Sequence, residues 1–113
     1  TLPWRGTSAG GGYSTVGDLL RFAEALKKGR LLDLKLMREA TSHQKPSPGY
    51  GFGFGVSDEA GIRRFGHGGG APGMNGDLRV YPDSGSVVAV LSNLNPPAAT
   101  RLADWLEQRL PGR

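Results

Sequence analysis

A histidine at the start of a glycine run is the part of this sequence best suited to chemistry. The run reads Phe65-Gly66-His67-Gly68-Gly69-Gly70-Ala71-Pro72-Gly73, and strand-like sequence follows it at residues 78–81. Glycines carry no side chain, so their backbone N–H groups can approach a ligand closely, and an imidazole can exchange protons. Together these groups can hold a substrate carbonyl or carboxylate, which indicates hydrolytic chemistry. Taken alone, the segment is more typical of a glycine-proline turn with an incidental histidine.

Two other strings imitate catalytic signatures but lack the setting that the chemistry needs. Gly68-x-Gly70-x-x-Gly73 satisfies the dinucleotide-binding pattern, yet a predicted strand follows it where the pattern requires a helix N-terminus. Ser42-x-x-Lys45 has the spacing of an acyl-enzyme serine and its lysine, in which the serine opens a helix. Here Ser42 follows a predicted helix, and Lys45 precedes a proline, which disfavours helix. We interpret both matches as coincidental.

Aromatic residues alternate with glycine in the run Tyr50-Gly51-Phe52-Gly53-Phe54-Gly55-Val56, which predicts a strand. The run is similar to the RNA-binding strand that exposes aromatic rings for base stacking. The leading basic residue of that pattern is absent, and Ser57 stands where its last aromatic belongs. A core strand explains the run more simply, and a nucleic-acid-binding domain remains an alternative function.

Composition limits the classes of protein to consider. A chain of 113 residues is long enough for one domain with its own core, and its lack of cysteine excludes disulfides and thiolate chemistry. The only two histidines, His43 and His67, lie far apart in the sequence, so we expect no metal ion or other cofactor. The 14 basic and 10 acidic residues give a net charge of +4 and alternate as on a solvated surface. No apolar run reaches ~20 residues, so we expect no membrane span and no signal peptide.

The order of predicted elements is helix, helix, four strands, helix. Thr15 opens a capping box whose acid is Asp18, and a shorter helix begins near Asp33. Strands are predicted over residues 50–56, 62–66, 74–81 and 87–91, and Asn95 is predicted to cap the last helix. This order is typical of an α+β fold, with two N-terminal helices and one C-terminal helix packed on an antiparallel sheet.

Apolar spacing also predicts which side chains form the core. Residues 87–91 are nearly all apolar, which predicts the centre of the sheet, buried on both faces. The predicted buried stripe of the last helix consists of Leu102, Trp105, Leu106 and Leu110. The predicted buried face of the first helix consists of Val16, Leu19, Leu20, Ala23 and Leu26.

Three segments follow one another in an order that is typical of one enzyme family. They are Ser8-Ala9-Gly10-Gly11-Gly12-Tyr13-Ser14-Thr15-Val16-Gly17-Asp18-Leu19-Leu20-Arg21-Phe22, then Gly66-His67-Gly68-Gly69-Gly70-Ala71-Pro72-Gly73, then Val88-Ala89-Val90-Leu91-Ser92-Asn93-Leu94-Asn95-Pro96. They resemble the AGG-x-x-ST-x-x-DL-x-RF stretch, the K-T-G or H-x-G motif and the central strand with its asparagine-rich exit in serine β-lactamase-type hydrolases. That family includes class C β-lactamases, DD-peptidases and related esterases. The resemblance covers almost the whole chain.

The resemblance implies the C-terminal part of a β-lactamase/transpeptidase-like fold. The family's nucleophilic S-x-x-K and its Y-x-N motif lie upstream of the AGG segment and have no counterpart here. We therefore expect residues 1–113 to be a single, partial domain that lacks the N-terminal catalytic part. The chain begins with Thr1 rather than methionine, as in a processed protein or an excised piece of a larger one.

The resemblance also assigns roles to residues of the glycine run. His67 would face the nucleophile and donate to the substrate or the catalytic tyrosine, and Gly70 would supply one N–H of the oxyanion hole. The predicted substrate-binding residues are Gly68, Gly69 and Asn93. Gly68 stands where the family usually has threonine or serine, and Asn93 would reach toward a substrate carboxylate.

The activity implied is hydrolysis of amide or ester bonds through an acyl-serine, on a small-molecule or peptide substrate, with this chain inactive alone. A free imidazole is mostly neutral where a lysine is charged, so we expect neutral esters or small peptides to be preferred over anionic β-lactams. The alternatives are a stand-alone binding or scaffold module and, less favoured, nucleic-acid binding. An unpaired sheet edge predicts self-association, and the family suggests a periplasmic or extracytoplasmic location.

Overall fold

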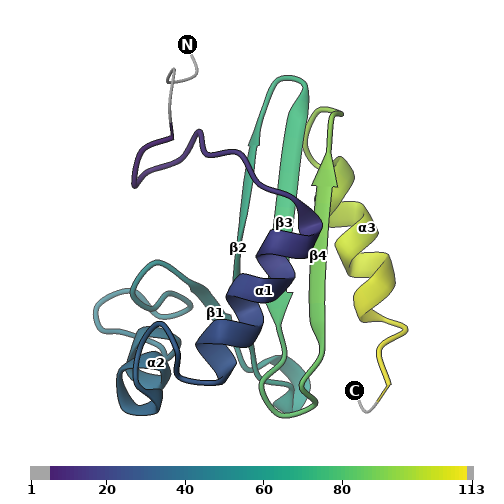
Figure 1. Cartoon of the computed structure of the whole chain (residues 1–113). Coiled ribbons are helices and arrows are strands. Elements are labelled where there is room, and N and C mark those ends of the chain that lie inside the picture. The colour runs from purple at the N-terminus through teal and green to yellow at the C-terminus, as the bar shows by residue number, and fades with distance from the viewer. Residues whose placement is uncertain (1–5, 112–113) are drawn as a thin grey trace.

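Two helices, four strands and a third helix follow one another along the chain, which confirms the predicted α+β fold (Figure 1). The computed structural model describes residues 6–111. The main elements are α1 (Val16–Lys27), α2 (Leu34–Ala40), β1 (Gly55–Ser57), η1 (Glu59–Gly61), β2 (Arg64–Ala71), β3 (Met74–Val80), β4 (Val87–Ser92) and α3 (Ala98–Glu107). The strands form one antiparallel sheet in the order β1-β2-β3-β4.

The first two helices begin where their capping residues predict. The Thr15 hydroxyl accepts a hydrogen bond from the backbone N–H of Asp18 at 3.1 Å, and the Asp33 carboxylate accepts one from that of Leu36 at 2.8 Å. Each bond satisfies an N–H that has no partner within its helix. Hydrogen bonds from Arg21 and then from Thr15 lower the pKa of Asp18, because both favour its charged form.

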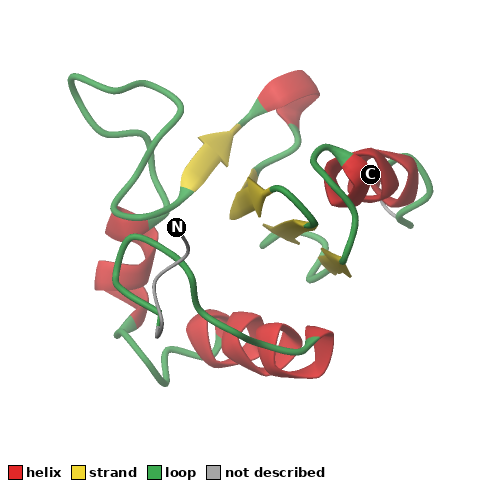
Figure 2. Ribbon diagram, turned by 90° about the horizontal axis from the view of Figure 1, so that it is seen from above, coloured by secondary structure: helices red, strands yellow, loops and turns green. Residues whose placement is uncertain are grey.

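Helices cover both faces of the sheet, as Figure 2 shows from above, with α1 on one side and α3 on the other. The core on the α1 face contains Ala23, Leu26, Met37, Val56, Phe65 and Val80. The core on the α3 face contains Tyr81, Val88, Val90, Ala99 and Ala103. Because side chains alternate along a strand, Phe65 and His67 of β2 lie on the α1 face.

The glycine run forms a strand, so its interpretation as a turn is wrong. β2 begins at Arg64 and continues through the glycines to Ala71, with Phe65 opposite Val80 and Gly70 opposite Asn75. Only Pro72 and Gly73, the last two residues of the run, form a turn. The strand predicted over residues 50–56 is mostly absent, since only Gly55–Ser57 form β1.

The C-terminal part of the chain differs from the prediction in three ways. Asn95 does not cap α3: its side chain accepts from the N–H of Gly73 at 2.6 Å. The cap comes instead from Asn75 of β3, whose Oδ1 accepts from the N–H of Ala99 at 2.7 Å. β4 lies at the edge of this sheet rather than its centre, and Leu91 is 44% exposed.

The buried stripe of α3 is also narrower than predicted. Leu102 and Trp105 are about half exposed, while the small residues Ala99 and Ala103 are fully buried against the sheet. Leu106 and Leu110 pack at the margin of this core, as expected. On α1, likewise, Ala23 and Leu26 are buried while Val16 and Leu20 are about half exposed. On α3 the small side chains allow the helix to approach the sheet closely, so the larger Leu102 and Trp105 lie outside the contact.

Candidate functional site

The glycine run borders an open edge of the sheet. β1 pairs only with Arg64–Gly66 of β2, so residues 67–71 have no strand beside them on that side within residues 6–111. The N–H of Val56 donates to Gly49 at 2.9 Å and so points away from β2, which makes Gly55 and Gly66 the pair that face each other. Backbone direction alternates along a strand, so Gly68 and Gly70 also direct their N–H groups toward the open edge.

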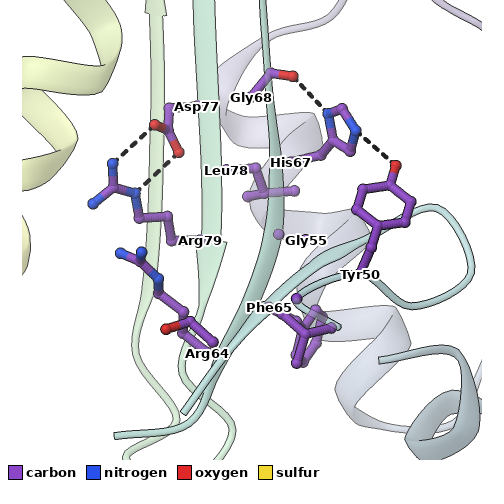
Figure 3. Close-up of a pocket in the computed structure, with 13 residues that line it drawn as sticks. Tyr50, Gly55, Arg64, Phe65, His67, Gly68, Asp77, Leu78 and Arg79 are labelled. Carbon is purple, nitrogen blue, oxygen red and sulfur yellow. Dashed lines mark hydrogen bonds and ion pairs between the residues drawn. The ribbon is translucent and has the colours of Figure 1, made fainter. Parts of the chain in front are cut away.

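The imidazole of His67 lies at this edge and has partners at both nitrogens (Figure 3). Nδ1 lies 2.5 Å from the backbone oxygen of Gly68, and Nε2 lies 2.9 Å from the hydroxyl of Tyr50. The rings of Tyr50 and His67 meet edge to face, with centroids 5.9 Å apart. Both side chains are exposed, so this polar pair is open to solvent and to a ligand.

Tyr50 comes from the segment that joins α2 to β1, and the backbone holds this segment in place. The oxygen of Tyr50 accepts from the N–H of Gln44 at 3.0 Å, and its own N–H donates to Ser47 at 3.1 Å. The next residue, Gly51, touches the end of α2 so closely that a Cβ there would lie 2.1 Å from the oxygen of Ala40. Only glycine permits this approach, and the contact fixes the position of the neighbouring Tyr50 relative to the end of α2.

A cavity of about 310 Å³ lies where β1 separates from β2. Tyr50, His67 and Gly68 line it together with the backbone of Gly55 and Gly66. Charged side chains of Arg64, Asp77 and Arg79 also line it (Figure 3). Its walls therefore combine polar, charged and glycine-backbone groups, and the cavity is large enough for a small organic group.

The structure places the predicted site residues at one end of the sheet but does not bring all of them together. Gly68, Gly69 and Gly70 continue β2 beyond His67. Asn93 follows Ser92 of β4, and the register places Ser92 opposite Asn75, which lies opposite Gly70. One strand, β3, therefore separates Asn93 from the glycine run, and no contact links it to His67.

A network of charges on the α3 face supports the sheet, and its members Arg64, Asp77 and Arg79 also line the cavity. Arg79 of β3 is nearly buried and bonds Asp77 at 3.0 Å, Asp104 at 2.7 Å and also Glu107. Burial opposes the charge of this guanidinium, but the hydrogen bonds to Asp77, Asp104 and Glu107 outweigh it and raise the pKa of Arg79. Glu107 also accepts from Arg64 of β2 at 2.6 Å. The network joins β2, β3 and α3, which indicates a structural rather than a catalytic role.

Sequence reasoning missed the roles of two side chains in this region, Tyr50 and His43. Tyr50 was predicted only as part of a strand, and nothing in its local sequence indicates His67 as its partner. His43 bonds Asp58 at 2.6 Å through Nε2 and accepts from the N–H of Gly49 at 2.9 Å through Nδ1. No local signal identifies these residues, because their partners lie 6, 15 and 17 positions away in the sequence.

The serine and lysine of the Ser42-x-x-Lys45 string lie outside any helix, which confirms the prediction. Ser42 follows the C-terminal end of α2, and its hydroxyl donates back to the oxygen of Arg38. Within residues 6–111 no three His, Asp or Glu side chains gather as a metal site requires, and no helix there is long and apolar enough to cross a membrane.

Known proteins share both this sequence pattern and this arrangement of strands. Residues 1–112 match the Beta-lactamase family, whereas no curated protein matches the sequence. A penicillin binding protein from Bacillus halodurans has a similar structure, with a TM-score of 0.82 and 26% identity over 93% of this chain. The match covers 34% of that protein, so the chain spans about a third of its length. A family match over nearly every residue, together with a glycine-rich strand whose histidine lies at an open sheet edge, shows that the chain belongs to the serine β-lactamase-type family.

Proposed function

We propose that this chain forms the sheet side of the substrate cleft of a serine hydrolase that cleaves amide or ester bonds through an acyl-serine. The observation that carries the proposal is the open edge of β2, where the backbone of Gly68 and Gly70 and the side chain of His67 lie beside a cavity. A carbonyl placed at this edge can accept from an N–H of the strand, as acyl transfer requires.

In this proposal Gly70 supplies one oxyanion N–H, and the nucleophile's own N–H supplies the other. The loss of one such donor costs roughly 3 kcal/mol of transition-state stabilisation. Half of an oxyanion hole without a nucleophile therefore does little, and we expect the chain alone to be inactive. The nucleophile and its base would come from residues outside the 113 of this sequence.

Acylation mapping tests the proposal. The chain alone and the product of any longer reading frame that contains it are each incubated with a fluorescent penicillin and with an activated phenyl ester. Peptide mass spectrometry then locates the adduct. We expect an adduct on a serine of an S-x-x-K motif upstream of Thr1 and none on the chain alone. An Ala substitution at the upstream serine should abolish labelling, while Ser42→Ala, which removes the misleading Ser42-x-x-Lys45 string, should leave it unchanged.

Two outcomes would contradict the proposal. An adduct within residues 1–113 would mean that the nucleophile lies in this chain. A longer product that carries S-x-x-K and yet reacts with neither reagent would remove the acyl-serine mechanism.

No observation favours nucleic-acid binding through residues 50–56. Phe54 packs edge to face on Phe65, with centroids 5.5 Å apart, so its ring belongs to the core and cannot stack on a base. Phe52 and Tyr50 are exposed, but the ring of Tyr50 packs edge to face on His67, so Phe52 alone remains for stacking, and a single ring makes a poor platform.

A further inference from the structure

The two hydrogen bonds of His67 determine where its protons lie. The backbone oxygen of Gly68 can only accept, so the Nδ1 atom that lies 2.5 Å from it carries a hydrogen. In a neutral imidazole the other nitrogen then has a lone pair and no hydrogen. Nε2 of neutral His67 must therefore accept, and the hydroxyl of Tyr50, 2.9 Å away, must donate.

The same reasoning gives the opposite tautomer for His43, the other histidine of the chain. Its Nδ1 accepts from the N–H of Gly49 at 2.9 Å, so this nitrogen carries no hydrogen. Its Nε2 carries the hydrogen and donates to Asp58 at 2.6 Å.

His43 also holds the segment that carries Tyr50. Gly49 is bonded on both sides, because its N–H donates to His43 and its oxygen accepts from Val56 of β1 at 2.9 Å. Tyr50 is the next residue along the chain, and its backbone bonds to Gln44 and Ser47. The tyrosine is thus attached to β1 and to the end of α2 before its side chain meets His67.

We infer that Tyr50 is the positioning residue of the site: its hydroxyl donates to Nε2 of His67 and orients the imidazole, while Gly68 places the hydrogen on Nδ1. This role in a substrate site rests on the proposed function, but the two hydrogen bonds of His67 can be measured without any substrate. In the neutral state neither nitrogen of His67 has a hydrogen left for a ligand. The atom of this pair that remains for a ligand is the hydroxyl oxygen of Tyr50, which accepts.

At the Tyr50–His67 pair itself, a ligand group that donates, such as an amide N–H or a hydroxyl, therefore fits better than a carboxylate does. Arg64 and Arg79 line the same cavity, but both already bond Glu107. The chemistry of the Tyr50–His67 pair differs from that of a lysine at position 67, whose ammonium would attract a carboxylate.

Nitrogen-15 NMR of the histidine side chains tests the inference on the chain as it is. At a pH where both imidazoles are neutral, long-range nitrogen–proton spectra distinguish the two tautomers. We expect the hydrogen on Nδ1 for His67 and on Nε2 for His43, so that each histidine serves as the internal reference for the other. In Tyr50→Phe the Nε2 atom of His67 loses its hydrogen-bond donor. We therefore expect its resonance to shift toward the position of an imidazole nitrogen that accepts no hydrogen bond, while the resonances of His43 stay in place.

Tyr13→Phe is the matched control, because Tyr13 is 87% exposed and lies in the loop before α1. It should move neither histidine. A hydrogen on Nε2 of His67 in the unsubstituted chain would overturn the inference even if Tyr50→Phe failed to fold. An unchanged Nε2 resonance in a folded Tyr50→Phe would also overturn it. Neither result depends on acylation, so a failure here is distinct from a failure of the proposed function.

Discussion

Gly66→Ala should destabilise the fold more than any other alanine substitution in the glycine run. A Cβ at position 66 would lie 1.8 Å from the backbone oxygen of Leu78 and 2.9 Å from its carbonyl carbon. The oxygen belongs to the neighbouring strand β3, so no side-chain rotation can relieve the overlap. The two atoms would have to separate by about 1.6 Å to reach an ordinary contact.

The energetic effect follows from this displacement. Overpacking of this kind costs up to about 3 kcal/mol, and a displaced hydrogen bond between β2 and β3 adds roughly 1 kcal/mol. A loss of about 4 kcal/mol is a large part of the 5–15 kcal/mol that typically stabilises a small domain. At roughly 4–8 °C per kcal/mol, the Tm should fall by about 15 °C or more.

Gly69→Ala provides the matched control, because a Cβ at position 69 would meet no atom within 4 Å. We expect this variant to be as stable as the original chain or up to ~1 kcal/mol more stable, since alanine restricts the unfolded chain. Urea unfolding followed by circular dichroism measures both variants. Urea unfolding resolves differences of about 0.5 kcal/mol in the free energy of unfolding. If the values for Gly66→Ala and Gly69→Ala agreed within that amount, the steric argument would be wrong.

Three further outcomes follow from contacts outside the glycine run. Asn75→Leu leaves the buried N–H of Ala99 without its acceptor, so the free energy of unfolding should fall by about 2 kcal/mol in urea titrations; an unchanged midpoint would mean that Asn75 is not the cap of α3. Burial, and then the charge of Glu107, raise the pKa of Tyr81. The neutral hydroxyl is therefore favoured on folding, and its contribution to stability is complete below the unfolded pKa of about 10 and is lost as pH rises through the folded value. Since this hydroxyl has no hydrogen-bond partner among residues 6–111, Tyr81→Phe should cost little at pH 7 and should weaken the loss of stability above pH ~10 in unfolding curves. An equally steep loss in the variant would contradict this. The outer edge of β4 carries no charged residue and should support self-association. Leu91→Lys should shift the mass measured by light scattering at high concentration toward that of a monomer, whereas Ser84→Lys in the β3–β4 turn should not. A chain that is monomeric without substitution would refute this edge as the contact.

The elements that sequence reasoning predicted correctly are those whose signals are local. Thr15 and Asp33 cap helices whose first N–H groups lie three residues away, so a window of four residues contains the whole interaction. The prediction that Asn95 caps α3 was wrong because the residue that does so is distant in the sequence. The residue that caps α3 is Asn75, 24 positions earlier, and only the pairing of β3 with β4 brings it to the helix.

The burial of the helices shows a second limit of periodicity. An apolar stripe identifies a face but not how much of that face the neighbouring element can cover. On α3 the sheet approaches the alanines so closely that Leu102 and Trp105 fall outside the contact. Burial in the sheet behaves similarly, because β4 has the composition of a central strand and yet has only one neighbour among residues 6–111.

The part of the candidate site that lies on β2 could be proposed from the sequence, because a strand edge and its histidine are contiguous there. Tyr50 was not, because it meets His67 across 17 positions and through a segment held by His43, Gly49 and Val56. No spacing rule connects these residues. Their arrangement follows from where α2 ends and where β1 begins.

The glycine run itself divides into two kinds of position once the contacts are known. Gly66 and Gly70 are required by packing, since a Cβ would meet the oxygen of Leu78 at the first and Pro96, 2.4 Å away, at the second. Gly68 and Gly69 have no such reason, because a Cβ would make one ordinary contact at position 68 and none at position 69. The absence of a side chain at Gly68 and Gly69 therefore leaves room for a ligand beside the strand, whereas Gly70, the proposed oxyanion donor, is glycine for packing as well. Gly68 and Gly69 follow His67 directly, at the part of the strand where the edge is open, which is where a substrate would lie.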